Sequence, residues 1–307
     1  METKVAGFSS RGVLSVVQLT TGDQNTFEYI SSGAAIKREL IAVKELNEGG
    51  VVNTLMVINN SDHFVFFMDG DILAGAKQNR VLNTSLLLAP QSKTQIPVSC
   101  VEQGRWRHVS PGFSSTDYVA PVRMRSSKAH KVTMNLKQNL GFVADQGEVW
   151  EGVASYSAAS GVESRTSNLS DVYEKRRAEL ERFVESFKPT SGANGVAFFL
   201  GQDLVNIDLF NRTDVFSEYL PKMVRGIGLE ALGLTEGRKS VPEAEAKFRV
   251  LDLLDKVGEV KTEVFPGAGA GEEKRFEVEQ YAGFELGYGQ QRIHTAVLRG
   301  RSAPRRA

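Results

Sequence analysis

Short apolar runs separated by polar turn residues dominate the first 110 residues. The runs are rich in Val, Ile, Leu and Phe, and Gly, Asn, Asp and Ser lie between them, which is typical of β-strands and their turns. Many short strands with few helical patterns among them favour an antiparallel β-sandwich or jelly-roll-like unit in this part of the chain. The pattern predicts strands at residues 13–19, 54–58, 64–68, 82–88 and 96–101.

One turn inside this β-rich part has a specific signature. Asp69 and Gly70 stand between the apolar run 64–68 and the pair Ile72-Leu73. Asp-Gly tolerates the positive φ angles of a type I′ turn, so the pattern predicts a β-hairpin at this position.

The middle of the chain has helical spacing instead. Residues 110–129 are polar and predict a loop, whereas apolar positions recur every three or four residues from Gly147 onward. Capping-box spacings predict helix starts at Asp171 and Ser240, and Asp214 opens a third helix. The glycine pair Gly226-x-Gly228 is predicted to end that third helix.

Further strands follow at residues 195–200 and 204–210, and three more close the chain at 276–278, 283–287 and 293–298. Strands first, helices in the middle and strands last predict an α+β fold in which the C-terminal strands return to the early sheet. We expect one integrated domain over residues 1–300, β-rich over 1–110, helix-rich over 145–258 and β-rich over 259–298. The basic residues 301–307 are expected to form a disordered tail.

Charge and cysteine content narrow the class of protein. The chain has 37 Lys and Arg against 37 Asp and Glu, so no overall positive charge attracts nucleic acid. The single cysteine, Cys100, cannot form an internal disulfide, which favours a reducing compartment. No apolar run reaches the roughly 20 residues of a membrane span. We therefore expect a cytoplasmic protein that binds neither membranes nor nucleic acid.

Common cofactor and metal motifs are absent. The four histidines are scattered and have no zinc-type spacing, so no metal site is predicted. Gly226, Gly228 and Ala231 fit a dinucleotide fingerprint formally, but they follow a helical segment rather than a strand. Asp69 and Asp71 are interpreted as turn residues, and the sequence names no cofactor.

Two polar segments stand out at the ends of predicted strands. One comprises Gln78, Asn79 and Arg80 before the run 82–88, and the other comprises Glu102, Arg105 and Trp106 after the run 96–101. Period-2 alternation places Gln78 and Arg80 on the apolar face of the first strand, and Glu102 on the apolar face of the second. Because an isolated buried charge is unfavourable, we expect Glu102 to pair with Arg80 or Arg105, with Trp106 over the cluster.

Two interpretations of this cluster remain open on pattern alone. It can be a ligand pocket in which Arg80 and Arg105 hold an anion, Glu102 acts as acid or base, and Trp106 stacks. It can equally be a buried ion pair that fixes a loop. Cys100, beside the cluster, is interpreted as a small core residue because buried cysteine is common. As a nucleophile it would need a base, and His108 is the only near candidate in the sequence.

The same segments resemble a known family. The stretches from Asp69 to Arg80 and from Ile96 to Trp106, with a later stretch from Asp208 to Ala231, look like a prokaryotic domain family. That family is named for its association with ADP-ribosylglycohydrolases and rhodanese–phosphatase superfamily proteins. Its name records neighbours rather than a reaction, and the resemblance implies ADP-ribose, NAD or a similar metabolite as ligand class.

The resemblance strengthens the pocket interpretation. We therefore expect a protein that binds or processes a small anionic, nucleotide-derived metabolite at Gln78, Asn79, Arg80, Arg105 and Trp106, with Glu102 as the catalytic group. The alternative is a non-catalytic module that binds a protein partner and in which the ion pair is structural.

Overall fold

A computed structural model describes residues 2–22, 27–46, 52–234 and 238–300 of the chain. The α+β class is confirmed, with antiparallel strands in both terminal parts and helices mainly in the middle. The predicted tail 301–307 lies outside the described residues, and the single domain over residues 1–300 stays a prediction. No helix of the described residues is long and apolar enough to cross a membrane.

The largest sheet joins the two ends of the chain. β2 pairs with β12, and β13 pairs with β17, so the first and last strands share one antiparallel sheet, as predicted. In spatial order its eight strands are β1 (Thr3–Arg11), β2 (Leu14–Thr21), β12 (Gly195–Leu200), β13 (Asp203–Phe210), β17 (Gln291–Arg299), β16 (Tyr281–Tyr288), β15 (Glu272–Val278) and β14 (Glu263–Pro266).

The other strands form a second β unit. A six-stranded antiparallel sheet has the order β11 (Phe113–Val119), β7 (Asp71–Gly75), β8 (Arg80–Leu82), β10 (Ser92–Cys100), β5 (Thr54–Asn59) and β4 (Ile41–Glu45). It curls until its two ends approach, and a Cβ on Gly112, just before β11, would lie 2.9 Å from the carbonyl oxygen of Val43 in β4. A three-stranded sheet of β3 (Tyr29–Ser31), β6 (Phe64–Phe67) and β9 (Leu86–Leu88) completes the unit.

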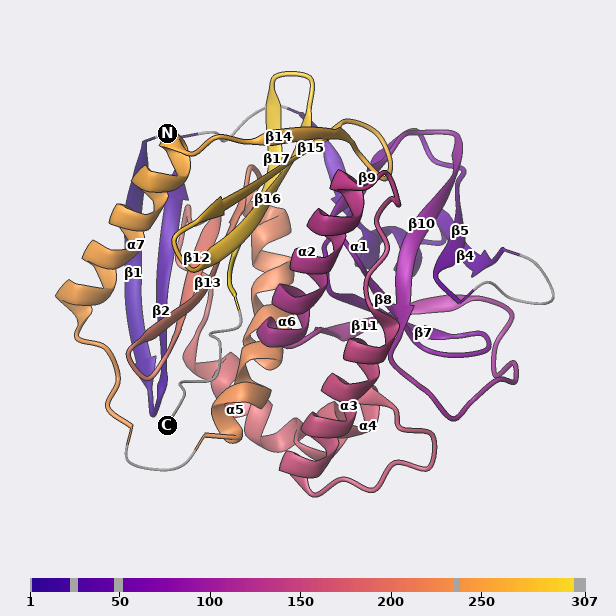
Figure 1. Cartoon of the computed structure of the whole chain (residues 1–307), viewed down its shortest axis with the longest axis horizontal. Helices are drawn as coiled ribbons and strands as arrows, with labels where there is room; N and C mark the ends of the chain where they lie inside the picture. The colour runs from indigo at the N-terminus through magenta and orange to yellow at the C-terminus, as the bar shows by residue number, and fades with distance from the viewer. Residues whose placement is uncertain (1, 23–26, 47–51, 235–237, 301–307) are drawn as a thin grey trace.

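Helices separate and cover the two β units. In Figure 1, β4, β5, β7, β8 and β10 lie on one side of α2 and α6, whereas β1, β2 and α7 lie on the other. The helices of the described residues are α1 (Ser32–Lys37), α2 (Val122–Lys137), α3 (Gln146–Ser160), α4 (Leu169–Lys175), α5 (Arg177–Ser186), α6 (Thr213–Leu232) and α7 (Glu243–Glu259).

The helix α2 replaces part of the predicted loop 110–129. The loop prediction was wrong because charged and polar residues alternate with apolar ones on the buried face of α2 and obscure its apolar stripe. Residues on that face include Arg125, Lys128, Thr133 and Asn135. A helix that buries charges needs partners for them in the neighbouring sheets, and α2 has such partners.

The glycine pair in α6 does not end the helix, contrary to the prediction. A Cβ on Gly228 would lie 2.9 Å from Leu180 of α5, and one on Gly226 would lie 3.1 Å from the carbonyl oxygen of Val119 in β11. Both glycines therefore permit close packing, and α6 continues to Leu232.

Two predicted helix starts also differ from the structure. α4 begins earlier than Asp171, because Asn168 is its N-cap and accepts a hydrogen bond from Ser170 N. α7 begins at Glu243, and its N-cap is Pro242 rather than Ser240. Local capping spacing identified the helices to within three residues but not their cap residues.

The predicted hairpin at Asp69-Gly70 is a turn between two sheets. Gly70 has the expected positive φ of 81°, and Asp71 N donates to the carbonyl oxygen of Met68. However, β6 pairs with β9 while β7 pairs with β8, so the strands diverge after the turn. The predicted strand 82–88 divides in the same way into β8 and β9.

Candidate functional site

The two polar segments singled out in the sequence meet in the structure. β10 and β8 pair with Cys100 opposite Arg80, which brings the start of one strand to the end of the other. The prediction that Glu102 pairs with a nearby arginine is confirmed, and the partner is Arg105. Trp106 lies over Arg80, with 5.9 Å between the guanidinium carbon and the ring centre.

Glu102 and Arg105 form a closed hydrogen-bond network. Arg105 Nε and Nη2 donate to the two oxygens of Glu102 at 2.8 and 2.6 Å. The same carboxylate accepts hydrogen bonds from Thr166 Oγ1 and from Asn79 N. Burial alone raises the pKa of Glu102, but the bonds from Arg105, Thr166 and Asn79 outweigh it and lower the pKa.

The rest of the Arg105 guanidinium is also occupied. Nη1 donates to the carbonyl oxygens of Ala76 and Arg107, and Nη2 also bonds Asn79 Oδ1. With these donors used, the geometry favours a role for Glu102 and Arg105 in holding three chain segments together. Their predicted roles in catalysis and ligand binding stay predictions.

Arg80 is held much less completely. Its side chain is fully buried, and Nη1 donates to the backbone and side-chain oxygens of Gln78. Its only ion pair among the described residues is with Glu45, and Nη2 is 3.5 Å from Oε1 of that residue. Trp106, which covers this pair, is 48% exposed, and Lys77 Nζ lies 5.2 Å from its ring centre.

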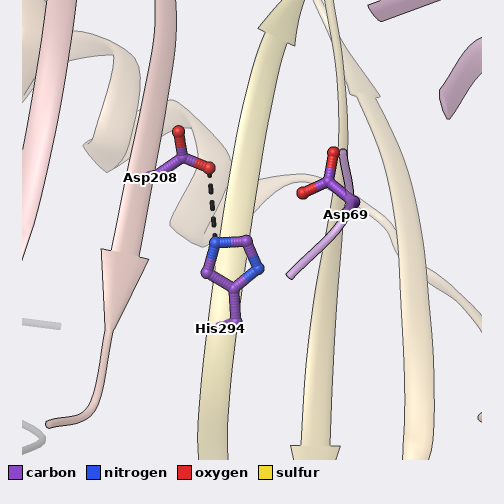
Figure 2. A group of neighbouring side chains, drawn as sticks. All are labelled: Asp69, Asp208 and His294. Atoms are coloured by element: carbon purple, nitrogen blue, oxygen red, sulfur yellow. Dashed lines mark ion pairs between the residues drawn. The ribbon is translucent and has the colours of Figure 1, made fainter. Parts of the chain in front are cut away.

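A second charged cluster lies between the two β units, and the sequence did not reveal it. Asp69, Asp208 and His294 point toward one another in Figure 2, and their ligand atoms lie within 4.8 Å. Arg125 of α2 joins the two carboxylates: Nη1 and Nη2 donate to Asp208 at 2.9 and 2.6 Å, and Nε and Nη2 donate to Asp69 at 2.9 Å. All four side chains are buried.

This cluster does not fit a metal ion in this arrangement. The guanidinium of Arg125 already bonds both carboxylates and supplies the positive charge that a cation would bring. Burial opposes ionisation of Asp208, but the charge of Arg125 outweighs it and lowers the pKa of Asp208 well below its usual range. The arrangement can link β13, α2 and the turn before β7 through one arginine.

The histidine completes the link to β17. Ser85 Oγ accepts a hydrogen bond from Asp69 N, so its own proton is available for His294 Nδ1 at 2.9 Å. His294 Nε2 faces Asp208 Oδ1 at 3.3 Å. The cluster could have been found from Asp208, because it is a carboxylate inside the predicted buried strand 204–210.

A hollow lies among the helices, apart from the Glu102–Arg105 and Arg80–Glu45 pairs. A cavity of about 630 Å³ lies between α2, α3 and α6 and reaches the end of β17. Its wall includes Arg123 and Met124 of α2, Ser155 and Tyr156 of α3, and Glu230 of α6. The space exists partly because α3 has small residues on this face, including Ser155 and Gly152.

Glu230 is the ionisable group that best fits a role in chemistry at this cavity. It is 6% exposed, and its Oε1 accepts hydrogen bonds from Tyr156 OH at 3.2 Å and from Arg123 N at 2.7 Å. Burial raises its pKa, although these hydrogen bonds oppose the shift. The bond from Arg123 N also serves α2, because its N-cap Pro121 offers no side-chain acceptor.

A family model, the ARG and Rhodanese-Phosphatase-superfamily-associated Protein domain or ARPP-1, matches residues 2–298. This chain belongs to the ARPP-1 family. The resemblance seen in the sequence is thereby confirmed, over nearly the whole chain. No curated protein and no solved structure matches it.

The ARPP-1 match covers both charged clusters and most of the cavity. Among the residues that line the cavity, only Arg299 and Gly300 lie beyond its end. None of Arg123, Tyr156 and Glu230 was singled out by the sequence, because three separate helices bring these residues together. A glutamate near the end of an amphipathic helix has no local signature that distinguishes it from a surface residue.

Proposed function

We propose that this ARPP-1 protein binds a small anionic, nucleotide-derived metabolite in the cavity between α2, α3 and α6. The volume of about 630 Å³ is in the range of small-molecule sites. The observation that carries the proposal is the buried carboxylate of Glu230 in the cavity wall, bonded to the hydroxyl of Tyr156. A group with a raised pKa in a cavity of this size is typical of a site that transfers protons.

Cationic groups at the cavity suit an anionic ligand. The side chain of Arg123 is 75% exposed, and within the part of the chain that the structure describes its one ion pair is a 3.5 Å contact with Glu230. Arg299 also lines the cavity, where it pairs with Asp203 at 2.7 Å. Arginine forks bind phosphates through paired hydrogen bonds.

The family name supports the ligand class by association. It links this domain to ADP-ribosylglycohydrolases, so ADP-ribose, NAD and their fragments are the first ligands to test. In this proposal Glu230 replaces Glu102 as the group that transfers a proton, and Glu102 positions loops. The protein would work in the reducing cytoplasm, where its one cysteine stays a thiol.

The proposal is tested by thermal unfolding against ADP-ribose, NAD, AMP and ribose 5-phosphate. A ligand at ~100 times its dissociation constant adds roughly 2.7 kcal/mol of stability, which is a shift of a few degrees for a chain of this size. Ser155→Phe fills the cavity from α3 and should abolish the shift. Ala159→Phe, at an exposed position of α3 that does not line the cavity, is the matched control and should preserve it.

A second variant separates binding from chemistry. Glu230→Gln keeps the size of the side chain and an acceptor for Arg123 N, so binding should persist while any turnover of the bound ligand stops. Chromatography of each ligand after incubation with either protein measures that turnover. A flat thermal panel, with Ser155→Phe unchanged, would contradict the proposal and favour the non-catalytic protein-binding module.

A further inference from the structure

The Arg80–Glu45 pair contains two buried hydrogen-bonding atoms without partners. Neither Arg80 Nε nor Glu45 Oε2 has a hydrogen bond among the described residues. The side chains of Arg80 and Glu45 are 0% and 6% exposed. Buried polar groups are nearly always paired, so this pair of unpartnered atoms requires an explanation.

The comparison with Arg105 shows that a buried arginine can have hydrogen-bond partners for all of its nitrogens. Arg105 is almost as buried as Arg80, and all three of its guanidinium nitrogens donate. Arg80 approaches Glu45 only at 3.5 Å, which leaves one donor and one acceptor unused on neighbouring ends of the same ion pair.

The chemistry of the two atoms specifies a complementary group. Arg80 Nε needs an acceptor, and Glu45 Oε2, as a carboxylate oxygen, needs a donor. A single group with an acceptor and a donor side by side satisfies both. A primary carboxamide has this edge, and so does the amino face of a nucleobase such as adenine.

Trp106 supplies a flat surface at the same place. Its ring lies over the guanidinium of Arg80 and is 48% exposed. Indole rings bind planar heteroaromatic groups by stacking. The positive charges of Arg80 and Lys77 near this ring favour an electron-rich or anionic partner.

We propose that Arg80, Glu45 and Trp106 form a second site, separate from the cavity, for a planar heteroaromatic group with an adjacent acceptor–donor edge. The ring stacks on Trp106 while its edge bonds Arg80 Nε and Glu45 Oε2. The Trp106 side chain changes rotamer to admit the edge while its loop stays in place, because the indole covers Arg80 in this structure. In this proposal Arg80 and Trp106 bind a ligand, as the sequence analysis expected, whereas Glu102 and Arg105 position the loop.

Fluorescence tests the site directly, because the chain has only two tryptophans. Trp150→Phe leaves Trp106 as the single reporter. Titration with nicotinamide and with AMP should each give saturable quenching if the shared edge is what is recognised. Quenching by nicotinamide alone identifies a carboxamide as the source, and quenching by AMP alone identifies a nucleobase. Ribose 5-phosphate, which has no aromatic ring to stack on Trp106, should give no quenching.

Matched ligands and variants test whether the acceptor–donor edge of the ligand is recognised. Nicotinate replaces the amide donor by an anionic oxygen facing Glu45, so it should bind at least about tenfold more weakly than nicotinamide, the ratio for one lost hydrogen bond to a charged group. Glu45→Gln can present its amide to nicotinate and should narrow or reverse that ratio.

The cavity variant keeps the two proposals apart. Ser155→Phe, in the Trp150→Phe background, should leave the Trp106 signal unchanged even if it abolishes binding in the cavity. No saturable quenching by either ligand, or equal affinity for nicotinamide and nicotinate, would overturn the second site and leave Arg80–Glu45 as a structural ion pair.

Discussion

Two buried arginines, Arg125 and Arg80, show how the same residue can be used in opposite ways. Arg125 is bonded to two carboxylates by four hydrogen bonds of 2.6 to 2.9 Å. Arg80 is equally buried but, among the described residues, has one long ion pair and an Nε without a hydrogen-bond partner. The first arrangement leaves no capacity for a ligand and joins three parts of the fold. The second leaves hydrogen-bonding atoms without partners among the described residues, beneath a half-exposed tryptophan.

Replacing each arginine by lysine is the sharpest test of this difference. Lysine keeps the charge but cannot fork between two carboxylates. Arg125→Lys should therefore lower the free energy of unfolding by about 3–5 kcal/mol, the range for breaking a buried pair. Arg80→Lys should lower it by only about 1–2 kcal/mol, because fewer hydrogen bonds are lost. Urea denaturation at pH 7 measures both, and equal losses would contradict the comparison.

Two glutamates that pair with buried arginines, Glu102 with Arg105 and Glu45 with Arg80, should differ in the same direction. Glu102→Gln places an amide against donors from Arg105, Thr166 and Asn79, and should cost about 2–3 kcal/mol. Glu45→Gln changes a side chain whose Oε2 is unpartnered, and should cost less than about 1 kcal/mol. The two variants make the same chemical change, so each is the control for the other in urea denaturation.

The dependence of stability on pH should distinguish the surroundings of Arg125 from those of Arg80. Lys128, whose ammonium donates to the carbonyl oxygen of Leu82, is buried beside this cluster, and burial lowers its pKa to about 7. Between that value and the unfolded value of about 10.4, the unfolded chain binds a proton that the folded chain does not. Folding should therefore become less favourable as pH falls from about 10 to 7, by roughly 1.4 kcal/mol per pH unit, and then level off.

Lys128→Met removes this dependence. The difference in unfolding free energy between variant and wild type should grow in favour of the variant as pH falls from about 10 to 7, and stay constant below 7. Denaturation midpoints at several pH values give the difference, and a difference that does not change with pH would show that Lys128 is charged in the folded protein.

The smallest effect is expected at Trp106. The side chain is 48% exposed, and its loop is fixed by Arg105 and Glu102 rather than by the indole. Trp106→Leu should change the unfolding free energy by less than about 0.5 kcal/mol, as at most surface positions. A large loss of stability would mean that Trp106 is a core residue rather than a movable cover.

The sequence was informative where a pattern is local. Apolar runs located most strands, and the pairing of Glu102 with an arginine nearby in the chain was predicted correctly. It failed where partners are distant: α2 buries Arg125 on its packed face because this residue meets Asp69 and Asp208 from other parts of the chain. The Asp69-Gly70 turn was recognised, but only tertiary pairing decides that the strands on either side enter different sheets.

The residues that line the cavity could not be predicted from the sequence. Glu230, Tyr156 and Arg123 are each unremarkable in their own helices, and only the packing of α2, α3 and α6 makes them neighbours. The predicted Arg80 cluster, by contrast, lies on paired strands, where alternation and register are readable in advance.

The strand order of the large sheet has a consequence for synthesis. β2 is apolar and buried, and its second partner, β12, begins only at Gly195. At ~5–20 residues per second, a ribosome needs roughly 10–35 s to make the chain between them. During that interval the hairpin of β1 and β2 has an open hydrogen-bonding edge, the kind of surface that recruits chaperones or aggregates. The nascent chain is thus most vulnerable before its helices are complete.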